Sequence, residues 1–440
     1  MKKLFLSSFA LNMVVMALNL MTGIMIARWL GSYGRGEFAA AIRWTALLVG
    51  LSTLGLPGAV IYLGKLYKER QQELLGSYLI AGVFFGLTGM GIGWLIMPLL
   101  MEGQPAELVL YARIAMICLP FSVMTDGLIG TLQSLNLFRK VMLLRLMSPL
   151  GSLLVILILQ VSGHLSVRNL ILYQIVIWGL FTFILTMSWV FRQVKPSLKN
   201  LHLNLSELMR NGIKIYGGSL VAVFGGNFDQ LILSLLLAPY ALGLYTVAGS
   251  IGGILPSVLF GALNVFLWPK LMDLKGEEKK KKTEQMHSMM LLLCTLVTLV
   301  ACACAPVLLP LLYGNEYKPA IWMAIILLAV APIRICSQLL LYYLNTEGKF
   351  NTVTLSELLS VGGGMGIMLL LMPYLGAIAA AIGIAGGSVL KWIVYIVILR
   401  SRGVNTKKLF TLHKRDISYM ASTIKSLLNA RWGKARQLEN

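Results

Sequence analysis

The sequence predicts an all-α integral membrane protein with about twelve transmembrane helices. We expect two six-helix lobes related by a parallel internal repeat, with both termini in the cytoplasm. Of the 440 residues, 58% are hydrophobic and 12% are charged, and the mean hydropathy is +0.79. A soluble domain carries about twice that share of charge. In addition, the apolar residues form long runs, and the positive charges gather on alternate loops.

The apolar runs are long enough to cross a membrane, which takes roughly 20 mostly apolar residues. The sequence has no short segments in which polar and apolar residues alternate, as the strands of a transmembrane barrel would require. Helices are therefore the expected form. The first run begins like a secretory signal, but it is too long and has no clear cleavage site, so we expect a first span there. The twelve runs lie at about 4–27, 38–64, 74–101, 107–133, 142–162, 169–191, 212–237, 241–269, 288–313, 319–345, 352–372 and 376–399.

Lysine and arginine predict the orientation of these spans. With the N-terminus inside, 29 of the 38 basic residues fall in inner segments and five fall within spans. The outer loops keep only Arg28, Arg35, Arg168 and Lys318. This bias predicts cytoplasmic N- and C-termini. The net charge of +21 lies in short loops between spans, so it does not indicate nucleic-acid binding.

Two matches between the halves suggest an internal repeat. LGSYGRGEFAAA at 30–41 aligns with LAPYALGLYTVA at 237–248, and LNLFRK at 135–140 aligns with LNTEGK at 344–349 at a similar offset. The first alignment pairs Tyr33 with Tyr240 and Gly36 with Gly243. Six spans per half keep both halves in the same orientation. Parallel repeats of this kind build two-lobed transporters with a site between the lobes.

The repeat predicts a division into four parts. These are an N-terminal lobe at 1–191, a cytoplasmic linker at 192–211, a C-terminal lobe at 212–400 and a basic cytoplasmic tail at 401–440. In the tail, Ile417, Met420, Ile424, Leu427 and Leu428 share one helical face. The tail is therefore either an interfacial amphipathic helix on anionic lipid or a solvated basic segment.

The sequence contains no recognisable catalytic motif. All five cysteines fall in apolar runs without metal or redox spacing, and the four histidines fall in loops or the tail. GAVIYLGKL at 58–66 has the wrong glycine spacing for a phosphate-binding loop. We therefore expect no enzyme activity, no cofactor and no metal.

Cations within or beside the spans carry the functional information. An arginine near the centre of a spanning helix costs about 2.5–3.5 kcal/mol on insertion scales, so it normally faces a cavity or a partner. Alternatively, those near helix ends simply extend to the interface. The candidates for a cationic substrate-binding cavity are Arg334, Arg113, Arg43, Arg145, Lys214 and Lys391.

Few carboxylates are available to balance these cations. Asp229, Asp126 and Glu357 are the candidates for ion coupling or for conformational pairing, and any of them could pair with Arg334. A cavity with several cations and few carboxylates suits an anionic cargo. Arginine is the better residue for phosphate, because its planar fork bonds two oxygens at once.

Three stretches resemble a known family. ARWLGSYGRGEFAAA at 27–41, FDQLILSLLLAPYALGLYTVAGSI at 228–251 and LLYGNEYKPA at 311–320 resemble the polysaccharide flippases of the multidrug/oligosaccharidyl-lipid/polysaccharide exporter superfamily. The resemblance covers essentially the whole chain apart from the tail.

The resemblance implies a two-lobed, twelve-helix transporter of a bacterial inner membrane. Its family moves undecaprenyl-pyrophosphate-linked oligosaccharide repeats to the outer leaflet by alternating access, often coupled to an ion gradient. The products are O-antigen, capsule or exopolysaccharide, and the implied partners are membrane lipid, the polysaccharide polymerase and other assembly proteins. Under this interpretation Arg43 holds phosphate, while Arg28 and Arg35 belong to a tight outer turn that meets cargo on release.

Two other functions stay open at this point. A cation or drug antiporter of the same superfamily would depend on Asp126 or Asp229 and not on the arginines. A membrane-embedded glycosyltransferase or polymerase would need catalytic residues in a sizeable loop, such as Glu102 or Glu316, and every loop between spans is short.

Overall fold

The structure is a computed structural model that describes residues 2–225, 228–262, 271, 274 and 276–411. Across these residues the regular elements are helices, and no strand occurs among them. The predicted helical face of the tail, from Ile417 onward, lies outside the described residues.

The first half of the chain forms a lobe of helices. It contains α1 (Lys2–Ser52), α2 (Leu56–Leu66), η1 (Lys68–Arg70), α3 (Gln71–Leu100), α4 (Ala106–Met116), α5 (Leu119–Ser134), α6 (Phe138–Val161), α7 (Val167–Leu170), the π-helical η2 (Ile171–Ile177) and α8 (Trp178–Phe191).

The second half begins with the long helix α9 (Leu201–Gly225). It continues with α10 (Phe228–Leu236), α11 (Pro239–Gly252), α12 (Ile254–Ala262), α14 (Gly276–Tyr313), η4 (Asn315–Tyr317), α15 (Ala320–Ala329), α16 (Ala331–Thr346), α17 (Phe350–Leu375), α18 (Ile378–Ser401) and η5 (Thr406–Leu409).

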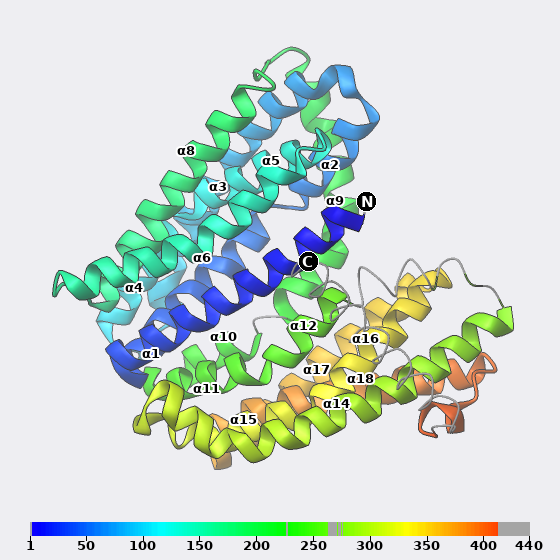
Figure 1. Cartoon of the computed structure of the whole chain (residues 1–440). Coiled ribbons are helices and arrows are strands. Elements are labelled where there is room, and N and C mark those ends of the chain that lie inside the picture. Colours follow the sequence, from blue (N-terminus) through cyan, green and yellow to red (C-terminus); the bar gives the residue numbers. More distant parts are fainter. Residues whose placement is uncertain (1, 226–227, 263–270, 272–273, 275, 412–440) are drawn as a thin grey trace, which may run out of the picture.

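The described parts of all twelve predicted runs lie mostly on helices, although several runs are divided by a bend. The first two runs share α1, which breaks at Gly31 with φ 70° and ψ −179°. Glycine adopts this conformation without the steric cost that a side chain would bring. The chain then returns toward its starting end (Figure 1).

The membrane character of the fold is confirmed, while the count of twelve spans stays a prediction. Among the described residues, nine helices are long and apolar enough to cross a membrane. A tenth is obtained if Pro239–Gly252 and Ile254–Phe260, bent by 44°, form one span. The 42-residue helix Leu11–Ser52 is counted once although it contains the break at Gly31.

Figure 1 shows the two lobes meeting at one end and diverging toward the other. We call the meeting point the closed end; it contains Gly31, Gln104, Ala238 and Glu316. The opposite side is the open end. The N-terminus lies there (Figure 1), and so does η5, which bonds the first turns of α14. Both ends of the described chain thus share one side, as the predicted topology requires.

The closed end is built on a two-fold related pair of glycines. A Cβ on Gly36 would overlap the carbonyl oxygen of Pro239, and a Cβ on Gly243 would overlap that of Ser32. The sequence alignment pairs Gly36 with Gly243 and Ser32 with Pro239. The contact is therefore the same in both directions, as expected of two halves related by a parallel repeat.

The second sequence match also falls on equivalent turns. Asn136, at φ 59°, and Gly348, at φ 69°, each link two antiparallel helices. The next residue in each turn bonds back five positions, Leu137 N–H to Leu132 O at 2.9 Å and Lys349 N–H to Leu344 O at 3.1 Å. In the structure, Asn136 is equivalent to Gly348, whereas the sequence alignment pairs Asn136 with Asn345, three residues earlier.

Hydrogen bonds between the lobes surround the glycine pair. Arg28 donates to the carbonyls of Leu311 and Leu312 near the end of α14, where a cation is favoured. In return, Glu316 accepts from the N–H and hydroxyl of Ser32, at the start of the second half of α1. Each lobe thus caps a helix of the other.

The predicted linker is packed on the N-terminal lobe and is not a free connection. The first turns of α9 lie against η1, where Arg70 forms an ion pair with Glu207 at 3.2 Å. Further along, Tyr216 donates to the carbonyl of Leu51 at 2.9 Å, and Gly55 lies against the backbone of Gly212. Later in α9 the chain reaches α17. Packing of α9 on the first lobe thus continues past residue 212.

The described part of the tail is fixed to the C-terminal lobe. Buried His287 on α14 bonds the Leu409 carbonyl through Nδ1 at 3.0 Å, and it accepts from Trp392 Nε1–H at Nε2 at 3.1 Å. A carbonyl only accepts and an indole N–H only donates, so the ring is neutral with its proton on Nδ1.

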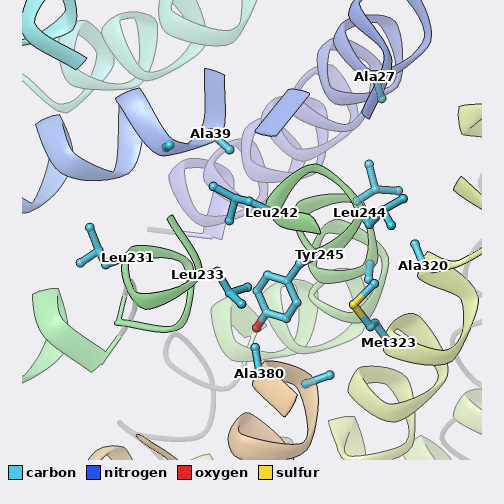
Figure 2. Close-up of a cluster of buried hydrophobic side chains, with 14 of the residues drawn as sticks. Ala27, Ala39, Leu231, Leu233, Leu242, Leu244, Tyr245, Ala320, Met323 and Ala380 are labelled. Atoms are coloured by element: carbon cyan, nitrogen blue, oxygen red, sulfur yellow. The ribbon is translucent and has the colours of Figure 1, made fainter. Parts of the chain in front are cut away.

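An apolar core crosses the closed end. Figure 2 shows part of it, with Ala27 and Ala39 from α1, Leu242 and Leu244 from α11, and Tyr245 near the centre. Small residues on both sides allow the helices to approach closely, as is usual within membranes.

We predict that Gly36→Leu opens the closed end. Spin labels at Tyr33→Cys and Tyr240→Cys, in a background without the five native cysteines, should report a label separation longer by at least about 2 Å, because side chains at the contact set helix separation. Gly362→Leu is the matched control, since no atom lies near its would-be Cβ. An unchanged distance in Gly36→Leu would contradict the glycine contact as the closure.

Candidate functional site

A cavity of about 950 Å³ lies where the lobes diverge from the closed end. Most of its wall belongs to the C-terminal lobe, and α1 contributes from the other lobe. The charged residues that line it are Arg35, Arg43, Asp229, Arg334, Glu357 and Lys391.

Two arginines of α1 reach this cavity from the N-terminal lobe. Arg35 and Arg43 are eight residues apart, which places them on one helical face about two turns from each other. Arg43 donates from Nε to Gln230 Oε1 of α10 at 2.5 Å, a bond that crosses between the lobes. The Nε of Arg35 is buried without a hydrogen-bond partner among the described residues. Arg35, expected in the outer turn, therefore lies one turn inside the helix and lines the cavity.

Asp229 is held by a tyrosine on the next helix. Tyr245 donates its hydroxyl to Asp229 Oδ2 at 2.6 Å, and both side chains are buried. In Figure 2 the Tyr245 hydroxyl points toward Ala380. A buried carboxylate needs such donors, because its desolvation is otherwise uncompensated.

Arg334 faces the same two side chains from the opposite wall. It stands two residues after Pro332 in the first turn of α16 and is half-buried. Its charge interacts with Asp229 and Tyr245, as does that of Arg43. The Arg334 side chain makes no hydrogen bond or ion pair within the part of the chain that the structure describes. Its guanidinium donors are thus available to a ligand.

Lys391 and Glu357 neutralise each other on another part of the wall. Lys391 Nζ lies 3.1 and 3.3 Å from the two oxygens of Glu357. Their side chains are 17% and 27% exposed. Of the carboxylates considered for Arg334, Glu357 is therefore taken by Lys391, and Asp229 is the one near Arg334.

The lining carries an excess of positive charge. Its described residues include four cations and two carboxylates, which leaves two positive charges. Such an arrangement can bind an anion. No group of residues that could hold a metal ion occurs among the described residues.

Several predicted site residues lie away from the cavity. Arg113 is half-buried, donates to the Trp94 carbonyl at 3.1 Å and lies over the Trp94 ring. Arg145 and Lys214 are exposed, and Arg28 belongs to the closed end. Asp126 lines a separate cavity of about 370 Å³ within the N-terminal lobe. The structure thus brings together Arg334, Arg43, Lys391, Asp229 and Glu357 from the predicted set.

Sequence reasoning missed several polar residues of the wall, among them Gln230, Tyr245 and Gln338. Gln230 could have been found, because it follows Asp229 directly in the polar cluster GGNFDQ. Gln338 lies one turn after Arg334 and shares its helical face. Tyr245 gave no signal, because a single tyrosine in an apolar run is ordinary.

Comparison with known families agrees with this architecture. A family model described as polysaccharide biosynthesis protein matches residues 2–275. The chain belongs to the polysaccharide biosynthesis protein family. A model of the lipid II flippase MurJ also matches residues 234–429. No curated protein sequence matches this member of the family.

Solved structures share the fold of this family member. Lipid II flippase MurJ in an inward closed conformation has a TM-score of 0.73 at 12% identity, covering 91% of this chain and 88% of that one. An inward-facing multidrug resistance MATE transporter of the MOP superfamily has a TM-score of 0.68 at 16% identity, covering 92% and 98%. The Vibrio cholerae MATE transporter VcmN in the bent form has a TM-score of 0.59 at 14% identity, covering 93% and 98%.

These relationships confirm two predictions made from the sequence. The chain belongs to the superfamily that its motifs resemble, and its fold and families are those of transporters and flippases, not of enzymes. It is a multi-pass membrane protein.

We predict that Tyr245→Phe destabilises the protein by about 1–3 kcal/mol, because it leaves the buried Asp229 carboxylate without its hydroxyl donor. Thermal unfolding in detergent measures this. Tyr374→Phe is the control, since that side chain is 84% exposed. Equal midpoints for both variants would mean that the bond to Asp229 contributes little.

Proposed function

We propose that this protein is a flippase for undecaprenyl-pyrophosphate-linked oligosaccharide repeat units. It moves them from the cytoplasmic to the outer leaflet of a bacterial inner membrane for the synthesis of O-antigen, capsule or exopolysaccharide. The observation that carries the proposal is the cavity, in which arginines from both lobes surround a site with two excess positive charges.

The charge of the cavity matches a diphosphate diester, which carries about two negative charges at neutral pH. Arg334 has free donors, and Arg35 and Arg43 approach from the other lobe. Arginine forks bond pairs of phosphate oxygens, and they act most strongly where water is excluded. The isoprenoid chain, which has no need of these donors, stays in the bilayer.

The direction of transport follows from the charge bias of the loops. If the positive-inside rule holds, the open end faces the cytoplasm and the closed end faces outward. Cargo would then reach the cavity from the inner leaflet. Alternating access would separate Gly36 from Gly243, release the caps at Ser32 and Arg28, and join the lobes at the open end. On the outer side of the membrane, the polysaccharide polymerase and other assembly proteins would then receive the cargo.

Asp229 is the residue that we propose for coupling to an ion gradient. Its carboxylate lies near both Arg43 and Arg334, so a proton or cation on Asp229 would remove a charge that competes with the cargo for these arginines. Asp126 lies in another cavity, and Glu357 already has Lys391 as a partner. Asp229 is therefore the best placed of the three predicted carboxylates.

A cation or drug antiporter is the second candidate, favoured by the buried carboxylate itself. In that case neutralising Asp229 would abolish transport, and neutralising the arginines would not. The excess of cations in the lining favours the anionic cargo.

We predict that Arg334→Gln and Arg43→Gln each weaken the binding of undecaprenyl diphosphate by about 10- to 100-fold. A hydrogen bond to a charged group contributes about 1.5–3 kcal/mol, and each 1.4 kcal/mol is tenfold. Binding is measured on the full chain in nanodiscs, and mass spectrometry of retained lipid compares wild type with Arg334→Glu.

Arg113→Gln and Arg145→Gln are the matched controls, since neither residue lines this cavity. If all four glutamine variants retained the lipid as wild type does, Arg334 and Arg43 would not be part of the binding site. Absence of any polyprenyl diphosphate from wild type, in cells that make it, would favour the antiporter.

A further inference from the structure

We propose that Glu357, Lys391 and Gln338 form a saccharide-binding subsite of the cavity, distinct from the arginines that hold the diphosphate. This inference rests on the proposed function, because it assigns the sugar part of the same cargo. The subsite would recognise neutral, hydroxyl-rich sugar residues through a carboxylate, an ammonium and an amide on three adjacent helices.

The first observation is that the ion pair forms part of the cavity wall. Both Glu357 and Lys391 line the cavity, and both side chains keep some exposure there. The lysine bonds both carboxylate oxygens at 3.1 and 3.3 Å. A ligand in the cavity would therefore touch the pair from its open side.

The second observation is that α17 and α18 do not need this pair to stay together. A Cβ on Gly364 would lie 2.8 Å from the Gly383 carbonyl oxygen, so the two backbones are in direct contact. Ser360 adds a hydroxyl bond to the Gly387 carbonyl at 2.8 Å. Close approach of small residues is the usual way in which membrane helices associate.

Stability gives no reason to keep the pair. Charged side chains within a membrane span are costly, and those that persist face a cavity or a functional pathway. Well-packed apolar residues can replace many buried ion pairs without loss of stability.

Anion binding gives no reason either. The charges of Lys391 and Glu357 cancel, so the pair adds nothing to the excess positive charge that would attract a diphosphate. What the pair does offer is hydrogen bonding of both kinds. A carboxylate accepts from hydroxyls, an ammonium donates to them, and the Gln338 amide does both.

The position of the pair suits a saccharide attached to the diphosphate. Gln338 lies one turn after Arg334 in α16, toward the open end. Glu357 stands seven residues into α17, about 10 Å along the helix from its start at the open end. The cavity thus runs from the arginines near the closed end to the polar groups of the subsite.

The test compares two lipids on the full chain in nanodiscs. One is undecaprenyl diphosphate, and the other is the same lipid carrying an oligosaccharide repeat from cells that make it. The variant Glu357→Gln with Lys391→Met removes both charges and keeps the net charge of the cavity. We expect the affinity for the bare lipid to stay within about twofold. The affinity for the glycosylated lipid should fall about tenfold, toward that of the bare lipid.

Two controls separate recognition from folding. Glu277→Gln with Lys280→Met removes a Lys–Glu pair of α14 outside the cavity and should change neither affinity. Gln338→Leu disrupts the subsite without touching the ion pair, and it should also weaken only the glycosylated lipid. It stands in for the double variant if that protein fails to fold.

Three outcomes would overturn the subsite. They are equal losses for both lipids, no loss for either lipid, and a wild type that binds the two lipids equally well. The last would leave the proposed function intact. A wild type that binds neither lipid would overturn the proposed function itself, and the subsite with it.

Discussion

The structure depends on the contact between two glycines at the closed end. Because Gly36 and Gly243 carry no side chain, each accepts the backbone of the other lobe where a Cβ would overlap it. Hydrogen bonds between the lobes lie at the same end, including the exchange of helix caps by Arg28 and Glu316. None of them is strong alone, since each is one hydrogen bond with a net value of about 0.5–3 kcal/mol. A closure of this kind holds the lobes in one orientation and can still be released.

The closure also determines where the cavity lies. With the lobes joined at one end, the second half of α1 runs along α10 and α11 of the C-terminal lobe and brings Arg35 and Arg43 to the cavity. Among the described lining residues, the charges that the N-terminal lobe contributes, Arg35 and Arg43, come from this helix. The C-terminal lobe supplies the carboxylates and most of the wall.

Much of the fold could be predicted from the sequence, because membrane physics leaves few alternatives. Long apolar runs can satisfy their backbone groups in lipid only as helices, so the runs predict the elements. The weak match between Gly36 and Gly243 contributed to the prediction of a repeat, whereas the contact between these two glycines was found only in the structure. The bends within runs could not be predicted in the same way, since they depend on packing against neighbouring helices.

The site was harder to predict, because composition identifies costly charges without telling which way they face. Arg334 and Arg43 line the cavity. In contrast, Arg113 donates a hydrogen bond to the Trp94 carbonyl, and Arg145 is exposed. Arg35 was placed in an outer turn because it lies between the first two apolar runs, yet the helix restarts right after Gly31 and Arg35 lines the cavity. Depth along a span is readable from sequence, but the direction of a side chain depends on the packing of the whole bundle.

One bond connects the site to the closure. The Nε of Arg43 donates to Gln230 across the lobe boundary, next to the carboxylate of Asp229. Under the proposed function, a phosphate in the cavity competes with Gln230 for the same guanidinium donors. The cargo then gains a charge-assisted bond, and the two lobes lose one of the hydrogen bonds between them. A ligand shifts a conformational equilibrium only by its difference in affinity for the two states. Competition at Arg43 supplies such a difference in the direction that transport requires, because the loaded protein is the one that must open outward.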